Sequence, residues 1–416
     1  MSLIKDYGFI TIMFGFPLFL RYLLSIALQQ EVSWAWYLNK GEILTSLKVI
    51  LGYLMIQMLL LVAAGPWKHD HHHVPNYKLN GIQSFVLSSI LTVCLWSRLS
   101  WVYLHFADLI MTLEWLAWLL CFILYLKGLY YPTQGSPRHQ TGNLFKDFVV
   151  GIEQYPAIND YQLKQVFNCR FGMMGWSTIV ICCLAYQQQT YGTITNSLLT
   201  SSMIQLIYIA KFFWWENGYF STIDVNYDYF GFYIAWGVTY CVPGFYTYSS
   251  IYLANRSMVL SSFQCVLYLT LGVVAIYINY EADHQKVQVR KNKSTNIQVG
   301  KNKENEIKVE KIWGQAVKTL TVKYHHDGIE KTTVLCLSGW WGVSRHFHYI
   351  PEVVTCLAWA LPCGFDPWQP YVYFIYLSIL LMHRIHRDEE KCSRKYGDYY
   401  KEYKRLVPYR LIPYVY

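Results

Sequence analysis

The stretch Met258–Tyr280 reads MVLSSFQCVLYLTLGVVAIYINY and contains no charged side chain. A helix needs about 20 predominantly apolar residues to cross the hydrocarbon core of a bilayer, and this stretch is long enough to do so. Buried helices of soluble proteins are usually shorter and less uniformly apolar. The stretch therefore predicts a transmembrane helix and decides the class of the protein.

Comparable apolar runs occupy much of the remaining chain, and we expect eight to ten membrane-spanning helices in all. Only helices and closed barrels satisfy the backbone in lipid, and runs of helix length exclude the barrel. The sequence thus predicts an all-α polytopic membrane protein. The other candidate spans are Phe9–Leu28, Val49–Ala64, Phe85–Tyr103, Ile110–Tyr125, Phe171–Tyr186, Leu198–Trp215, Phe230–Tyr248 and, more weakly, Val353–Cys363 and Tyr371–Met382.

Composition agrees with this class. The chain is 54% hydrophobic and only 15% charged, whereas soluble domains carry about a quarter charged residues. The net charge of +9 comes mainly from residues 286–331 and 383–410. Basic segments beside spans follow the positive-inside rule, which predicts that both segments and the C-terminus face the cytosol. We therefore expect the lipid bilayer, and no nucleic acid, as a partner.

The amino-acid composition changes between Val287 and Gly314, where the sequence is rich in polar residues and reads VQVRKNKSTNIQVGKNKENEIKVEKIWG. This segment is too poor in large apolar residues to bury a core, and we predict a flexible cytosolic loop. We divide the chain into an N-terminal transmembrane region, residues 1–280, and a C-terminal transmembrane region, residues 281–416, which contains this loop.

Several ionisable residues lie in or beside the predicted spans. Charges in a bilayer are costly and usually face a partner or a cavity, unless they lie near a helix end and extend to the interface. The second explanation suits Arg98. For the cluster that contains Glu216, Asp224 and Asp228, a polar cavity remains an equal alternative.

Common catalytic signatures are missing from the sequence. It contains no GxGxxG after a strand, no GxxxxGK[ST] and no GxSxG, so a dinucleotide would not be bound by a Rossmann unit. The run His69–His73 contains four histidines, but consecutive histidines cannot all face one ion, and we predict no metal site. Eleven cysteines without a CxxC pair indicate neither a disulfide framework nor a zinc site.

The basic tail has two readings of equal weight. Within HRIHRDEEKCSRKYG, residues 383–397, five cations crowd beside Asp388, Glu389 and Glu390. Such a tail either attracts anionic lipid or forms a phosphate-binding pocket at the membrane, where guanidinium groups bind phosphate in a bidentate manner. Neighbouring aromatic rings could then stack on an adenine or nicotinamide ring.

A family resemblance favours the second reading. GWWG (339–342), RHFHY (345–349), ALPCGF (360–365), HRxxRDEExC (383–392), KYG (395–397) and VPYRLIPY (407–414) occur in the order and spacing of the sterol reductase family. The resemblance extends upstream through YKLNGIQSF (77–85), KGLYYPT (127–133), TGNLFKDFVVGIE (141–153), FFWWENGYFSTID (212–224) and FGFYIAWG (230–237). It implies about ten transmembrane helices in the endoplasmic-reticulum membrane, a sterol pocket within residues 1–280, and a cytosol-facing NADPH pocket in the C-terminal half.

The resemblance also assigns residues by motif match. Tyr246, in VPGFYTY, is the leading proton donor for reduction of a sterol carbon–carbon double bond, and Tyr403 and Asp388 would orient or relay the proton. Burial of such an acid in an apolar pocket would keep it protonated. The NADPH contacts are expected at Lys286, Arg290, Cys336, Trp341, His348, Tyr349, Asp388, Cys392, Ser393, Arg394, Lys395, Tyr396 and Tyr403.

The local motifs favour the branch of the family that reduces the C7–C8 bond of a 5,7-diene sterol, as in the conversion of 7-dehydrocholesterol to cholesterol. The segment LPCGF instead resembles the Δ14 branch, which stays the alternative. Three departures from the family pattern are Val238 in place of an acidic residue, QYPAIN after Glu153, and Tyr248-Ser249. They keep open a non-catalytic sterol-binding homologue. A transporter is disfavoured because no inverted repeat is visible.

Overall fold

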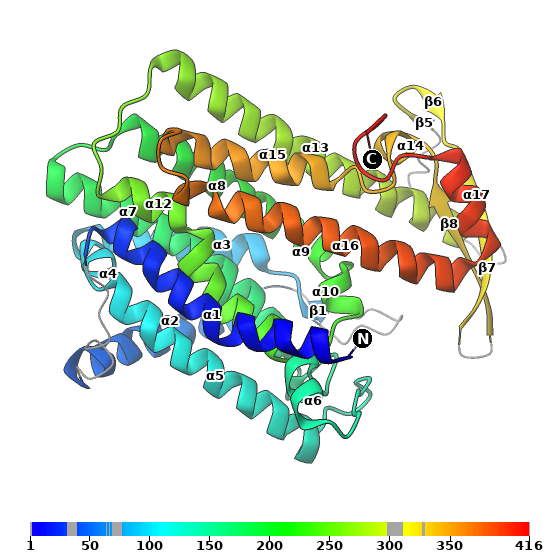
Figure 1. The fold of residues 1–416 in the computed structure, drawn as a ribbon, viewed down its shortest axis with the longest axis horizontal. Coiled ribbons are helices and arrows are strands. Elements are labelled where there is room, and N and C mark those ends of the chain that lie inside the picture. Colours follow the sequence, from blue (N-terminus) through cyan, green and yellow to red (C-terminus); the bar gives the residue numbers. More distant parts are fainter. Residues whose placement is uncertain are drawn as a thin grey trace. The chain divides into compact units, whose positions relative to one another are not determined.

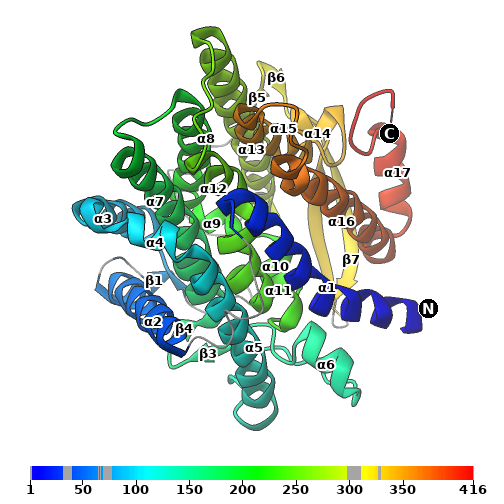
Figure 2. The same ribbon diagram turned by 60° about the vertical axis from the view of Figure 1, so that its left-hand side comes forward.

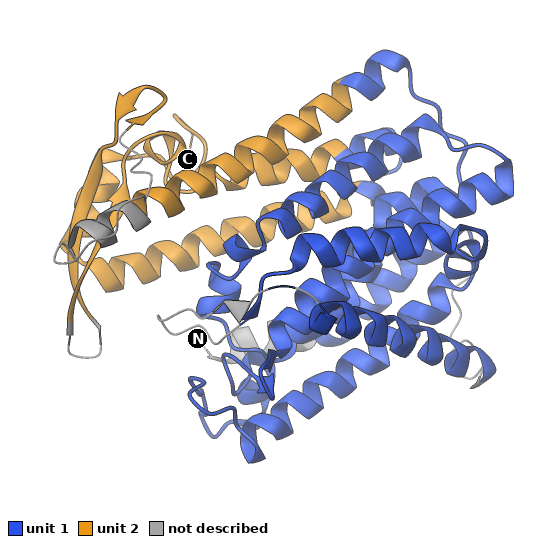
Figure 3. Cartoon of the chain, turned by 180° about the vertical axis from the view of Figure 1, so that it is seen from behind, with its two compact units in different colours: residues 1–266, 359–370 blue, residues 267–358, 371–416 orange. Residues whose placement is uncertain are grey.

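The computed structural model describes residues 2–30, 40–63, 65, 67–68, 77–297, 311–326 and 329–415 of the 416-residue chain. Its elements are mostly helices, which confirms the predicted class in the main (Figure 1). The chain forms two compact units, and each is described by itself below (Figure 3). Unit 1 comprises Met1–Val266 and Trp359–Pro370, and unit 2 comprises Leu267–Ala358 and Tyr371–Tyr416.

Unit 1 is mostly helical, and its long helices α7 and α8 lie against each other and against the short helix α12 (Figure 2). Its elements are α1 (Ser2–Leu28), α2 (Lys40–Ala63), β1 (Trp67–Lys68), β2 (Tyr77–Lys78), α3 (Gly81–Cys94), η2 (Trp96–Arg98), α4 (Ser100–Leu104), α5 (Phe106–Tyr130), α6 (Leu144–Val150), β3 (Ala157–Ile158), β4 (Tyr161–Gln162), η3 (Gln165–Met173), α7 (Met174–Tyr191), α8 (Asn196–Trp214), α9 (Glu216–Tyr219), α10 (Ile223–Asn226), α11 (Phe232–Trp236), η4 (Gly237–Tyr246), α12 (Tyr248–Ala254) and η5 (Leu361–Cys363).

Unit 2 combines helices with an antiparallel hairpin. It takes most of α13 (Ser262–Ile297), then β5 (Lys311–Ile312), β6 (Gln315–Ala316), β7 (Thr319–His326), β8 (Ile329–Cys336), α14 (Trp340–Val343), most of α15 (Tyr349–Ala360), the end of η6 (Gln369–Tyr371), α16 (Val372–Tyr396) and α17 (Asp398–Leu406). β7 pairs with β8 from Thr319 opposite Cys336 to His326 opposite Ile329.

Four helices in the described part of the chain are long and apolar enough to cross a membrane. The predicted span Met258–Tyr280 lies mostly within one of them. A bent pair, α3 with η2 and α4, would make a fifth, and two shorter apolar helices, Met13–Leu28 and Tyr349–Cys363, fall below this length. The four are Gly41–Ala63, Phe106–Tyr130, Gln165–Tyr191 and Ser262–Arg290.

The predicted span Phe85–Tyr103 is not one straight helix. The two halves meet at an angle of 66°, because Leu95 leaves helical geometry (φ −93°, ψ 14°) and its N–H bonds to carbonyls of the preceding turn. Composition alone does not reveal such a break, since neither Gly nor Pro marks it.

Two helices of unit 1 are wound as π-helices, η3 and η4, and they touch at a glycine. A Cβ on Gly172 would lie 2.8 Å from the carbonyl oxygen of Val238, so the close approach of the two backbones requires glycine there. The side chain of Val238 is itself buried. π-Helical turns are uncommon and frequently occur at functional sites.

Arg170 and Arg21 in unit 1 are each paired with a carboxylate. The Arg170 guanidinium binds both carboxylate oxygens of Glu216, at 2.5 and 3.0 Å, and also donates to the side-chain oxygen of Asn80 at 2.8 Å. Arg21 donates to Glu114 at 2.9 Å. An ion pair therefore explains the ionisable residues Glu216 and Glu114 without a cavity at either carboxylate.

Two features of unit 2 differ from the prediction. The eight-residue strands β7 and β8 were not expected in an all-α chain. The polar segment from Val287, predicted as a flexible loop, begins as helix, because α13 continues to Ile297. Its Lys, Gln and Arg residues are good helix formers, and Val289 packs into a buried cluster. β5 begins at Lys311; residues 298–310 lie outside the described residues.

Candidate cofactor site

Lys286 and Trp341, both predicted to contact a cofactor, lie together in unit 2. The Lys286 Nζ atom is 4.1 Å from the centroid of the Trp341 ring, a cation–π contact. The indole N–H of Trp341 donates to the carbonyl oxygen of Ala282 at 2.7 Å. This bond fixes α14 against α13 one turn before Lys286.

The GWWG motif provides this docking through its first glycine. Gly339 has φ +59°, and a Cβ there would lie 2.1 Å from the side-chain oxygen of Gln285, so both backbone conformation and space require glycine. The next residue, Trp340, donates its backbone N–H to the same Gln285 oxygen at 3.2 Å and its indole N–H to Glu281 at 2.9 Å. The GWWG motif therefore packs α14 against α13.

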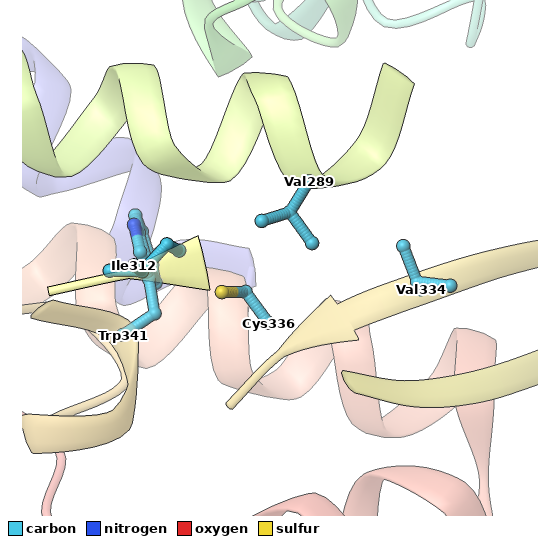
Figure 4. Close-up of a cluster of buried hydrophobic side chains, with 5 residues drawn as sticks. All are labelled: Val289, Ile312, Val334, Cys336 and Trp341. Carbon is cyan, nitrogen blue, oxygen red and sulfur yellow. The ribbon is translucent and has the colours of Figure 1, made fainter. Parts of the chain in front are cut away.

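A buried apolar cluster lies between α13 and the hairpin. In Figure 4 the Val289 side chain on α13 faces Val334 and Cys336 on β8, with Ile312 and Trp341 beside Cys336. The Cys336 thiol donates to the carbonyl oxygen of Ser338. Burial raises the pKa of this thiol, so Cys336 stays protonated and serves as part of an apolar wall rather than as a nucleophile.

Tyr403 belongs to a second buried cluster, in which α17 packs on the hairpin strands with Val322, Leu335, Tyr400 and Val407. Burial is also the main cause that raises the pKa of Tyr403 well above its usual range. Its hydroxyl therefore keeps its proton at physiological pH and is available as a donor.

Cations crowd near the end of α13. Lys286 lies close to Arg290, with the carboxylate of Asp388 as a nearby counter-charge. Lys395 sits 4.4 Å from the ring centroid of Tyr324. Burial and the proximity of Arg290 and Lys331 lower the pKa of Lys395. Mutual repulsion of this kind is relieved by a bound anion, so the group suits phosphate.

Three other predicted cofactor contacts, Arg394, Ser393 and Tyr396, lie at the end of α16. Arg394 is 81% exposed and lies 4.0 Å from Glu390, one helical turn earlier. Ser393 accepts a hydrogen bond from Lys404 at 3.3 Å. The Tyr396 ring meets Tyr324 edge-to-face. Arg394 thus faces solvent.

Cys392 and the pair His348 and Tyr349 complete the predicted set in unit 2. Burial and nearby Asp388 raise the pKa of the Cys392 thiol to about 11. The rings of His348 and Tyr349 lie 4.0 Å apart, and His348 is 5.0 Å from Trp341. The backbone carbonyl of His348 accepts a hydrogen bond from Asn279 on α13 at 2.9 Å.

Tyr246, the predicted proton donor, belongs to unit 1. It is the last residue of the π-helix η4. Its ring packs edge-to-face on Trp176, with centroids 5.5 Å apart. Trp176 is in turn fixed by a hydrogen bond to Gln205 at 2.8 Å, so the ring of Tyr246 rests on a rigid neighbour.

The sequence reasoning missed a buried ion group in unit 2. Arg345 donates to Glu389 at 2.7 Å, and Arg410 pairs with the other Glu389 oxygen at 3.0 Å. Both Arg345 and Glu389 are buried. A signal was present: Glu389 follows Leu377, Leu381 and Ile385 at four-residue spacing, which places a carboxylate on the buried stripe of α16.

The described residues contain no group of three or more His, Cys, Asp or Glu side chains that could hold a metal ion. The run His69–His73 lies outside them. The clustered cations and aromatic rings of unit 2 suit an anionic, aromatic ligand. Clustered cations suit phosphates and neighbouring rings suit bases.

Comparison with known proteins gives a family match over nearly the whole chain. Residues 7–416 match the family described as "Ergosterol biosynthesis ERG4/ERG24 family". The chain is similar to "7-dehydrocholesterol reductase" of Arabidopsis thaliana, with 36% identity over 348 residues that cover 82% of this chain and 77% of the relative. The protein of the same name from Xenopus laevis is 36% identical over 351 residues (82% and 70%). "Probable 7-dehydrocholesterol reductase" of Acanthamoeba polyphaga mimivirus is 35% identical over 345 residues (82% and 72%).

Proposed function

Because the chain belongs to the ERG4/ERG24 family of sterol reductases, we propose that it reduces the C7–C8 double bond of a 5,7-diene sterol with NADPH. The choice of double bond is supported by the names of its relatives and by its own motifs around Trp236-Gly237 and Arg345–Tyr349. The observation that carries the proposal is the convergence of cations and aromatic rings from α13, α14, α16 and α17 within unit 2.

The residues proposed to hold the cofactor divide by chemistry. Lys286, Arg290 and Lys395 are the cations for phosphate. Trp341, His348, Tyr349, Tyr396 and Tyr403 offer flat rings, and Cys336 and Cys392 offer protonated thiols. Asp388 balances the charge of Lys286, and Ser393 and Arg394 complete the set by family resemblance. When bound, NADPH supplies a hydride to one carbon of the double bond.

The protein supplies the proton for the other carbon. We assign this role to Tyr246, whose ring is braced by Trp176. Reduction adds one hydride and one proton, so the phenolate left on Tyr246 must regain a proton before the next turnover. Tyr403 and Asp388 are proposed to orient or relay that proton. Burial keeps Tyr403 in the protonated form that such a role requires.

Topology and location follow from the same proposal. About ten transmembrane helices would include the shorter apolar segments and the bent pair. We propose residues 1–280 for the sterol pocket and residues 281–416 for the cofactor region. The basic stretches at 286–331 and 383–410 support a cytosolic C-terminus in the endoplasmic-reticulum membrane.

The test is a reductase assay on membranes from cells that lack their own sterol reductases. Membranes containing this chain receive NADPH and either a 5,7-diene or an 8,14-diene sterol, and mass spectrometry identifies the products. We expect conversion of the 5,7-diene alone, and its loss in Tyr246→Phe. Tyr191→Phe is the control, because the Tyr191 hydroxyl is exposed and bonded to Asn255.

Conversion of the 8,14-diene alone would place the protein in the Δ14 branch. If the folded protein binds NADPH but reduces neither diene, catalysis is excluded and the non-catalytic homologue stands. In that case Val238→Asp, which restores the acidic residue of the family pattern, tests whether this departure is the cause.

A further inference from the structure

Residues 407–410, which follow α17, form a short segment that is called the strap below. Arg345 donates from Nη1 to the carbonyl oxygens of Val407 and Pro408, at 2.6 and 2.9 Å. The backbone N–H groups of Arg345 and His346 donate to the carbonyl oxygens of Tyr409 and Arg410, at 3.0 and 2.9 Å. Four hydrogen bonds therefore join the strap to the start of segment 345–349.

The strap is also tied to α16. Glu389 accepts a hydrogen bond from Arg345 Nε at 2.7 Å, forms an ion pair with Arg345 Nη2 at 2.6 Å, and pairs with Arg410 Nε at 3.0 Å. Arg345 and Glu389 are nearly inaccessible, with side chains 4% and 6% exposed, whereas Arg410 is 40% exposed. One carboxylate thus links the strap, segment 345–349 and the helix that carries Asp388.

Segment 345–349 lies away from Arg290 and Lys395, two of the three cations proposed to bind phosphate. The third, Lys286, contacts Trp341, whose ring is 5.0 Å from that of His348. Along α16, Glu389 precedes Lys395 by six residues, about 9 Å of helix rise. Along α13, Asn279, which bonds to the carbonyl of His348, precedes Arg290 by eleven residues, about 16 Å. A dinucleotide with its phosphates at Arg290 and Lys395 would therefore reach segment 345–349 with its opposite end.

The side chains of this segment suit an uncharged ring. Arg345 is neutralised by Glu389, and burial lowers the pKa of His346 to about 3, so this imidazole is neutral. The His346 Nε2 atom is 3.9 Å from Glu389, too far for a hydrogen bond. The rings of His348 and Tyr349 lie 4.0 Å apart. The segment therefore offers aromatic surface without net charge.

We propose that the strap 407–410 is a positioning element that holds segment 345–349 against the nicotinamide end of the bound dinucleotide. The inference rests on the proposed function for the identity of the ligand. The residues of the strap act through Arg345 and Glu389.

The test compares two ligands and two arginines in the full-length, detergent-solubilised protein. Arg410→Ala removes the strap's contact with Glu389. Arg405→Ala is the matched control, because Arg405 is 75% exposed and pairs with Glu402 on the surface of α17. Dissociation constants are measured for NADPH and for adenosine 2′,5′-bisphosphate, which carries the 2′-phosphate but no nicotinamide. Thermal unfolding of each variant is recorded alongside.

We expect Arg410→Ala to weaken NADPH binding about tenfold, the equivalent of one charge-assisted contact. Its affinity for adenosine 2′,5′-bisphosphate should stay within about twofold, and Arg405→Ala should change neither ligand by more than that. If Arg410→Ala does not fold, the same comparison is made with Arg410→Lys, which keeps the charge but loses the planar guanidinium.

If a folded Arg410→Ala variant loses affinity for both ligands equally, Arg410 has a general structural role and the positioning proposal is overturned. Unchanged NADPH affinity would overturn it as well. Failure of the wild-type protein to bind NADPH at all would instead refute the proposed function, and this inference with it.

Discussion

The Arg170–Glu216 pair in unit 1 allows a quantitative test of how much a buried ion pair contributes to the free energy of unfolding. Arg170 is fully buried and Glu216 is 3% exposed. Replacement of Arg170 by Met leaves the Glu216 carboxylate buried without its partner. Removing one member of a buried pair costs about 3–5 kcal/mol, and we expect a loss of this size in the free energy of unfolding.

The double variant Arg170→Met with Glu216→Met should recover much of that loss, because no charge remains to be desolvated. Recovery is incomplete, since the Asn80 oxygen loses the hydrogen bond from Arg170 and an unpaired buried acceptor costs about 1–3 kcal/mol. The two replacements are thus strongly non-additive, as expected for residues in contact.

The assay is equilibrium unfolding in mixed micelles with increasing SDS, read by tryptophan fluorescence. Lys323→Met serves as control, because Lys323 and Glu330 form an exposed pair 3.4 Å apart on the hairpin and should contribute less than about 1 kcal/mol. A double variant that loses the sum of the two single losses would refute the reasoning, because the pair would then carry no coupling energy.

Three further predictions concern individual charged side chains. Burial lowers the pKa of Lys164 from 10.5 to about 7. Between these values the unfolded chain binds the extra proton, so stability should rise with pH by up to about 1.4 kcal/mol per unit, and SDS unfolding of Lys164→Met should lack this slope. Lys286→Met should weaken NADPH binding at least about tenfold in fluorescence titration, because it removes the ammonium proposed to bind phosphate. In the same titration Lys395→Ala should cost more affinity than Arg394→Ala, since Arg394 is 81% exposed.

The long helices were predictable because an apolar run of span length has few alternatives. Less of unit 2 was predictable. The hairpin carried a readable signal that was overlooked: two runs rich in Thr, Val and Ile flank the dipeptide Asp327-Gly328, a common hairpin sequence. The extension of α13 past Val287 had no such signal. It depends on Val289 meeting Val334 and Ile312, contacts that are distant along the chain.

The run Asp388-Glu389-Glu390 shows why the sequence indicated the position of the candidate site but not the partner of each charged side chain. Successive helical residues point about 100° apart, so three adjacent carboxylates face three environments. Asp388 lies near Lys286, Glu389 is buried against Arg345, and Glu390 is 58% exposed. The apolar stripe of α16 predicts which of the three is buried. It cannot name the partners, because Arg345 and Arg410 are brought to Glu389 only by the packing of α14, α16 and the strap. A carboxylate with no local partner on an apolar stripe therefore predicts a long-range contact, and in this chain that contact joins the C-terminal residues to the proposed cofactor site.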